Sequence, residues 1–170
     1  MKRLITFLLA IVLFTTVGYA QSFLSVSDIL SIRKGLMAET TSWALILKNK
    51  GYNKTMTYEG DDYAYKNCRL VYVDSKPYHS DGEYFEADRK TADASYVHFY
   101  NGGFCVVVYT QVIAKKWIEQ AKVLGYRLDK TRGGTDRFGS NFYFIKRGNP
   151  EIRISEKSGR YMLDIDEKSY

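Results

Sequence analysis

The sequence contains none of the common catalytic motifs: it has no Gly-x-Ser-x-Gly, no His-Glu-x-x-His and no phosphate-binding loop. Histidine is scarce as well, with only His79 and His98. His79 lies near acidic residues in a polar stretch, but the spacing matches no standard set of metal ligands, and a solvated loop explains it equally well. His98 alternates with Tyr96 and Tyr100, as a hydrogen-bonded residue of a sheet would. We therefore expect neither a metal ion nor a cofactor.

Carboxylates suited to acid–base catalysis are also few, because such chemistry needs two carboxylates in distinct environments. The sequence offers Asp61 and Asp62, which we expect in a turn, and residues 164–167, which we expect at a frayed end. These features favour a non-enzymatic protein. The alternative is a small envelope hydrolase with an unconventional site made of carboxylates and His79.

The only cysteines are Cys68 and Cys105, and both lie in alternating, strand-like segments of the same half of the chain. Two cysteines of an exported protein often pair, so a disulfide between strands is possible. The other interpretation is two buried free thiols that act as small apolar residues. Neither cysteine lies beside a helix start or a histidine cluster, so we expect no catalytic thiol.

A hydrophobic run that could cross a membrane is missing. Residues 4–14 are apolar apart from one threonine, but they fall short of the roughly 20 residues that span a bilayer. Lys2 and Arg3 precede this run, and small residues at Gly18 and Ala20 suit signal peptidase. We expect residues 1–20 to be a cleaved signal peptide rather than a retained anchor, with Gln21 first in a periplasmic or secreted protein.

Residues 21–170 then form a single domain, large enough for a substantial core. Without Lys2 and Arg3 the chain keeps 23 basic and 19 acidic residues. Residues 111–153 hold 10 basic and 4 acidic residues, whereas residues 21–110 hold 10 and 11. The basic second half fits an anionic partner, and it fits a role in solubility equally. We expect a protein or an anionic envelope component as the partner, and no nucleic acid.

The hydrophobic pattern changes between period 3.6 and period 2 along the chain. Before Gly51 the apolar row runs to Leu36 and resumes at Trp43, which fits either one long helix or two short ones; we favour a helix–loop–helix, capped by Ser27 or Asp28. A further helix is expected over 112–124. Strands are expected over 52–58, 63–73, 95–100, 104–110, 126–130, 141–146, 151–155 and 161–165, with a short edge strand near Tyr84. This order predicts an α+β domain, in which helices pack on one face of an antiparallel sheet.

The two tryptophans indicate a tandem duplication of a helix-then-strands unit. Trp43 and Trp117 are 74 residues apart, and each lies eight residues before a Gly-Tyr pair. The predicted repeats are residues 25–110 and 111–170. On these features the chain resembles the β-lactamase inhibitor protein and its relatives. That resemblance implies a binding protein with a concave sheet face. The family carries a disulfide in each repeat, whereas both cysteines here fall in the first half, and no functional residue is transferred.

The leading functional hypothesis is therefore an exported binding module, either an inhibitor of a secreted enzyme or an envelope scaffold component. The best candidate contact site is the glycine-rich loop 131–140, where Arg132, Arg137 and Phe138 combine charge with an aromatic ring. Its glycines allow close approach of the backbone. Tyrosine is abundant, with 15 residues in the chain, and most of them suit half-buried positions of a sheet.

Overall fold

The computed structural model describes residues 23–57, 60–66, 68–74, 83–100, 103–136 and 139–169, so the expected signal peptide and Gln21 lie outside it. The described helices are α2 (Val26–Met37), α3 (Ser42–Asn49) and α4 (Gln111–Val123). The strands of the first half are β1 (Tyr52–Thr57), β2 (Gly60–Tyr65), β3 (Leu70–Asp74), β4 (Glu83–Ala87), β5 (Ser95–Tyr100) and β6 (Gly103–Val108). Those of the second half are β7 (Arg127–Leu128), β8 (Gly134–Asp136), β9 (Gly139–Ile145), β10 (Pro150–Lys157) and β11 (Arg160–Ser169).

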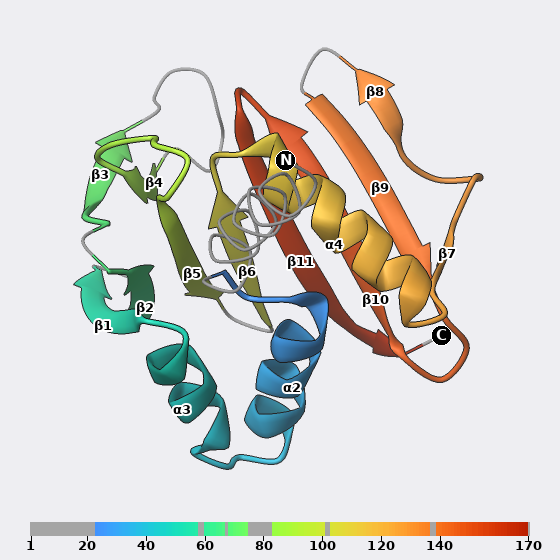
Figure 1. The fold of residues 1–170 in the computed structure, drawn as a ribbon, viewed down its shortest axis with the longest axis horizontal. Coiled ribbons are helices and arrows are strands. Elements are labelled where there is room, and N and C mark those ends of the chain that lie inside the picture. The colour runs from blue at the N-terminus through green and yellow to red at the C-terminus, as the bar shows by residue number, and fades with distance from the viewer. Residues whose placement is uncertain are drawn as a thin grey trace, which may run out of the picture.

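The main sheet is antiparallel and runs in the order β1-β2-β5-β6-β11-β10-β9-β7, with β8 paired to β9 (Figure 1). Its first four strands come from the first half of the chain and its last four from the second half. The two halves meet where β6 pairs with β11, for example at Val106 and Leu163. β3 and β4 form a separate two-stranded sheet. The predicted α+β class is confirmed.

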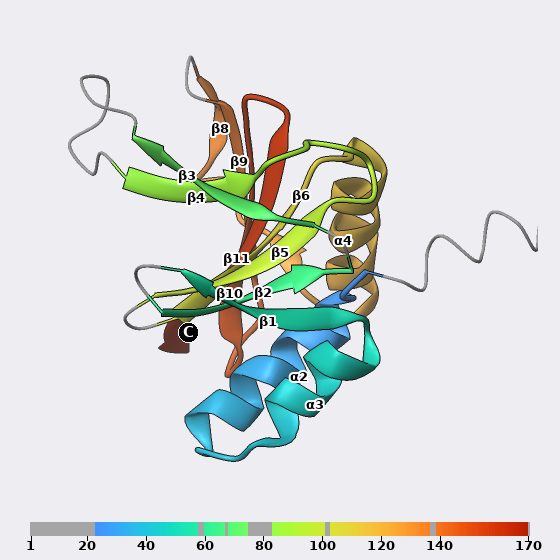
Figure 2. The same ribbon diagram turned by 90° about the vertical axis from the view of Figure 1, so that its left-hand side faces the viewer.

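All three described helices pack against one face of the main sheet. In Figure 2, α4 lies on one side of β5 and β6, and the β3–β4 hairpin projects on the other side. Alternate residues of β6 and β11 point into the helix-covered core, among them Phe104, Val106 and Leu163. The intervening residues, such as Val107 and Cys105, form a smaller cluster on the opposite face. We call this second face the helix-free face.

The predicted helix–loop–helix is confirmed as α2 and α3, but its cap is Ser25 rather than Ser27 or Asp28. Ser25 and Asp28 form a reciprocal capping box, which satisfies two backbone amides at the start of α2. Gly35 lies inside α2 for a packing reason. A Cβ atom there would lie 3.1 Å from both Ser42 Oγ and Trp43 Cβ, so the glycine lets α3 pack closely.

The two predicted repeats share local features but differ in their helices. Gly51 and Gly125 both end helices with positive φ, at 84° and 85°, and each precedes a buried tyrosine. Trp117 is 1% exposed and its indole nitrogen donates to Leu24 O at 2.9 Å, whereas Trp43 is only partly buried. The first half has two described helices and the second has one. The duplication stays a prediction.

Three predictions of local structure were wrong. The segment 63–73 is divided between β2 and β3, because Cys68 N donates to Tyr65 O in a turn between them. Asp61 and Asp62 belong to β2 rather than to a turn, and Asp164 lies inside β11 rather than at a frayed end. The short strand expected near Tyr84 is confirmed as β4. No helix in the described ranges is long and apolar enough to cross a membrane.

Candidate functional site

The helix-free face carries a row of polar side chains that crosses six strands. The ladder pairs His98 of β5 with Cys105 of β6, Cys105 with Asp164 of β11, and Asp164 with Arg153 of β10. Arg153 in turn pairs with Tyr143 of β9. Asp62 of β2 joins the row through His98, as described below. The polar row therefore consists of Asp62, His98, Cys105, Asp164, Arg153 and Tyr143.

At one end of the polar row a buried carboxylate holds an imidazole. His98 Nδ1 lies 3.1 Å and 3.2 Å from the two carboxylate oxygens of Asp62, whose side chain is fully buried. The backbone N–H of Phe99 also donates to Asp62 Oδ1, at 3.1 Å. The His98 side chain remains 24% exposed. The buried carboxylate of Asp62 thus fixes the imidazole ring from the interior side, while part of the ring remains exposed to solvent.

In the middle of the row a second buried carboxylate holds a guanidinium group. Arg153 Nε donates to Asp164 Oδ2 at 3.2 Å, and the side chains are 45% and 11% exposed, respectively. Arg153 also hydrogen-bonds the Tyr143 hydroxyl. Burial raises the pKa of Asp164, and the positive charge of Arg153 opposes this shift without cancelling it. The pair is therefore a partly desolvated ion pair, whose cation lies on the outer side.

A third pair of the same kind involves Arg132, the described member of the predicted contact site. Arg132 Nη2 donates to Glu151 Oε2, and Arg132 Nε donates to Asp129 Oδ2 at 2.9 Å. Its guanidinium carbon lies 4.8 Å from the centre of the Tyr143 ring, within cation–π range. The side chains of Arg132 and Glu151 are 38% and 4% exposed. Arg132 is thus fixed against the sheet rather than projecting from a loop tip.

Two further predictions concern the glycine-rich loop: the role of Arg137 and Phe138, and the role of its glycines. Arg137 and Phe138 lie outside the described residues. The glycines bring the loop close to the chain's own strands: a Cβ atom on Gly133 would lie 2.4 Å from Asn141 O, and one on Gly139 would lie 1.7 Å from Glu156 O. Both glycines also have positive φ. They are needed for internal packing, which the sequence analysis did not foresee.

Cys68 and Cys105 are free cysteines, so the interpretation as separate thiols describes the structure and the bridge is not formed. Cys105 lies in the sheet beside His98, in a Cys–His–Asp arrangement with Asp62. Burial raises the pKa of the Cys105 thiol well above its ordinary value, and the carboxylates of Asp164 and Asp62 act in the same direction. A thiolate is therefore disfavoured, which argues against a nucleophilic role.

Sequence reasoning missed Asp62, Asp164 and Arg153 as members of one site. A signal was present in β10 and β11: Arg153 stands between two buried isoleucines, and Asp164 stands between a buried leucine and a buried isoleucine. Such alternation places a charged pair on one face of neighbouring strands. The partner of Asp62 lies 36 residues away, and no local pattern could identify it.

Among the described residues no group of three or more His, Cys, Asp or Glu side chains could hold a metal ion. His79, the one histidine considered with acidic neighbours, lies outside those residues. The described site therefore consists of three pairs of a carboxylate with a basic side chain on the helix-free face: Asp62 with His98, Asp164 with Arg153, and Glu151 with Arg132. No protein-family model, curated protein or solved structure matches this chain.

Proposed function

We propose that this chain is an exported, non-enzymatic binding module whose helix-free face contacts an acidic surface of a protein partner. A secreted enzyme that the module inhibits, or a component of the cell envelope, would each provide such a surface. One observation carries the proposal: in all three pairs on this face, the carboxylate is buried and the basic side chain lies outermost.

This arrangement has a physical consequence for binding. The carboxylates of Asp62, Glu151 and Asp164 are 0%, 4% and 11% exposed, so they hold the outer groups in place without meeting the solvent. Fixing an arginine before binding lowers the conformational entropy that association must remove. Arginine and tyrosine are also the side chains enriched in interface cores, and Arg153 lies beside Tyr143.

The arrangement of buried carboxylates beneath outward basic side chains argues against a role in stability alone. Buried ion pairs often add little net stability, because desolvation offsets the Coulomb attraction. Paired apolar residues at these positions would serve the fold equally well. A row that spans β2 to β9 and keeps its cations at the surface is better explained by recognition of an anionic group. The positive charge of residues 111–153 acts in the same direction.

The alternative, a small hydrolase, now rests on the Asp62–His98 pair, since a carboxylate orients the imidazole base in many hydrolases. Burial raises the pKa of the adjacent Cys105 thiol, which disfavours a thiolate there. The described residues thus provide an oriented base without an activated nucleophile, which leaves binding as the better proposal.

The experiment compares the proteins captured by residues 21–170 and by two double variants, from the culture fluid and envelope fraction of the producing cell. Arg153→Met with Asp164→Leu removes the central pair without leaving a buried charge, and it preserves the net charge. The control, Glu119→Leu with Lys122→Met, removes an exposed ion pair from α4 on the other side of the sheet.

We expect the wild type and the control to bind the same partner, with an affinity that falls as salt is added. The sheet variant should bind it at least about tenfold more weakly, since a contact in an interface core typically contributes more than 1.4 kcal/mol. Equal affinity of all three proteins would contradict the proposal. Turnover of chromogenic ester, amide or phosphate substrates that is lost in His98→Gln would favour the hydrolase instead.

A further inference from the structure

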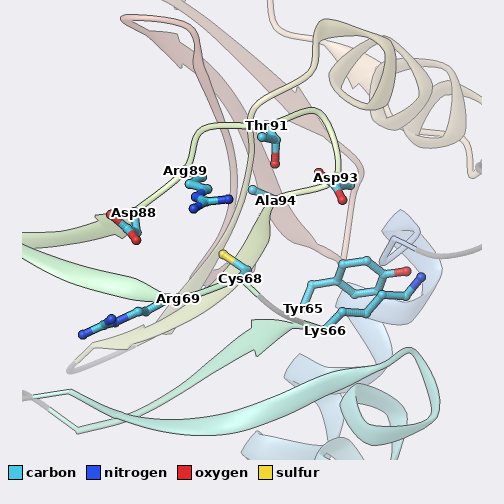
Figure 3. A pocket seen from close by; sticks show the side chains of 9 residues that line it. All are labelled: Tyr65, Lys66, Cys68, Arg69, Asp88, Arg89, Thr91, Asp93 and Ala94. Carbon is cyan, nitrogen blue, oxygen red and sulfur yellow. The ribbon is translucent and has the colours of Figure 1, made fainter.

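A cavity of ≈ 450 Å³ lies away from the polar row, where the β3–β4 hairpin leaves the main sheet (Figure 3). Two connections form its walls: the segment from β2 to β3, and the segment from β4 to β5. The residues that line it are Tyr65, Lys66, Cys68, Arg69, Asp88, Arg89, Thr91, Asp93 and Ala94. Its volume lies in the lower part of the range of small-molecule pockets, about 300–1,000 Å³.

Backbone hydrogen bonds hold the walls together. Asp88 N donates to Arg69 O at 2.8 Å, which ties one connection to the other. Cys68 N donates to Tyr65 O and Ala94 N donates to Thr91 O, so each connection also contains its own turn. The cavity is therefore bounded by chain segments that are fixed to each other and to β2 and β5, and it does not depend on side-chain packing alone.

The charged side chains of the walls are only partly matched to one another. Asp93 is satisfied locally: hydrogen bonds from Thr91 and from the backbone lower its pKa. Within the described residues Arg69 and Arg89 form no ion pair and no side-chain hydrogen bond, although both line the cavity together with Asp88. Figure 3 shows the Arg89 guanidinium directed toward the other lining side chains, whereas the Arg69 side chain points away from them.

We propose that this cavity binds a small organic anion that carries a carboxylate or a phosphate group. The Arg89 guanidinium, directed inward, offers the planar fork of donors that matches either oxyanion. Arg69 points away from the cavity, and its positive charge adds only a longer-range attraction for the anion. The carboxylate of Asp88 then accepts a hydrogen bond from a hydroxyl or amino group elsewhere on the ligand. This inference does not depend on the proposed function of the helix-free face.

Cys68 provides a reporter inside the cavity. Its sulfur lies on the wall and accepts a hydrogen bond from the backbone N–H of Ser95, and burial raises the pKa of the thiol. The thiol is half-buried, whereas Cys105 is buried in the sheet. Alkylation at alkaline pH should therefore modify Cys68 first. A ligand that occupies the cavity should slow this modification.

The test measures calorimetric binding of citrate, of glucose 6-phosphate and of uncharged glucose to residues 21–170. Citrate and glucose 6-phosphate distinguish the carboxylate from the phosphate, and glucose shows whether the anionic group is required. The cavity variant is Arg69→Ala with Arg89→Ala, and the control is Lys115→Ala with Lys130→Ala, which removes the same charge from exposed residues elsewhere. Arg89→Gln alone serves if the double variant melts early.

We expect at least one of the two anions to bind with a Kd below about 10 mM, and glucose not to bind. The affinity should fall at least about tenfold in the cavity variant and stay unchanged in the control. The same anion should slow alkylation of Cys68. The proposal is overturned if neither anion saturates the protein, if the cavity variant binds like the wild type, or if binding leaves Cys68 equally reactive.

Discussion

Replacement of the two tryptophans separates the contributions of the two helices that carry them. Trp117 of α4 is 1% exposed, and its indole nitrogen donates to Leu24 O, so Trp117→Ala removes a large core side chain and leaves a buried carbonyl without its partner. We expect a loss of about 3–5 kcal/mol in the free energy of unfolding. For a domain of 150 residues, that corresponds to a melting temperature roughly 10 °C lower.

Trp43 of α3 should contribute less. It is partly buried and packs against Tyr63 and Phe99, with ring centroids at 5.8 Å and 5.2 Å. Water reaches part of the indole already, so Trp43→Ala forfeits less apolar burial, and we expect a loss of about 1–3 kcal/mol. The duplication predicted from the sequence would place both tryptophans in equivalent environments and would therefore give equal losses.

Urea denaturation followed by circular dichroism measures both losses, with the slope of each transition checked against the wild type. Each variant also retains a single tryptophan. The emission of Trp117, measured in Trp43→Ala, should lie at shorter wavelength than the emission of Trp43, measured in Trp117→Ala, because Trp117 is shielded from water. A greater loss of stability for Trp43→Ala than for Trp117→Ala would refute this reasoning.

Three further predictions concern charged groups. Arg132→Ala should lower the free energy of unfolding by about 1–3 kcal/mol, because it leaves the buried Glu151 without its cation. The control Lys130→Ala, at an exposed position, should change it by no more than about 0.5 kcal/mol. Equal urea midpoints for the two variants would show that Arg132 is not needed for the fold. The raised pKa of Asp164 gives stability that is complete below the unfolded pKa near 4 and is lost as pH rises, so Asp164→Asn should gain on the wild type between pH 4 and pH 7. Asp28 has a lowered pKa: burial opposes ionisation there, but hydrogen bonds from Lys50 and Ser25 outweigh it. The stability that Asp28 contributes is therefore present above the unfolded pKa near 4 and is lost as pH falls below it, so Asp28→Asn should fall behind the wild type as pH rises to about 4 and keep that deficit at higher pH. Parallel pH profiles for these two variants would contradict both assignments.

The elements that sequence reasoning found are those in which a local signal and the tertiary environment agree. The hairpin of β5 and β6 has aromatic and β-branched residues on both sides of the Asn101-Gly102-Gly103 turn sequence, and both predicted strands are present. Gly51 and Gly125 mark helix ends because the left-handed conformation there is costly for other residues. Even the division into α2 and α3 followed from an interruption of the apolar pattern after Leu36.

The members of the candidate site were missed because their meaning depends on pairing across the sheet. Asp61 and Asp62 have the composition of a turn, yet β2 pairs with β5 and places Asp62 next to His98. Asp164 was expected at a frayed end, yet pairing of β11 with both β6 and β10 places it in the middle of the sheet. Register between distant strands is not encoded in a window of a few residues.

The polar row is continuous only because of the way the two halves of the chain join, so the proposed binding depends on that junction. Asp62 and His98 come from the first half, and Asp164 and Arg153 come from the second, so the row is continuous only because Cys105 of β6 pairs with Asp164 of β11. Either half alone would lack half of the row and would expose the edge of β6 or β11, where unpaired backbone groups invite association with other chains. A partner that contacts the whole row would therefore bind only the assembled domain. Substitutions that loosen the β6–β11 junction should weaken that binding even where no contact residue is changed.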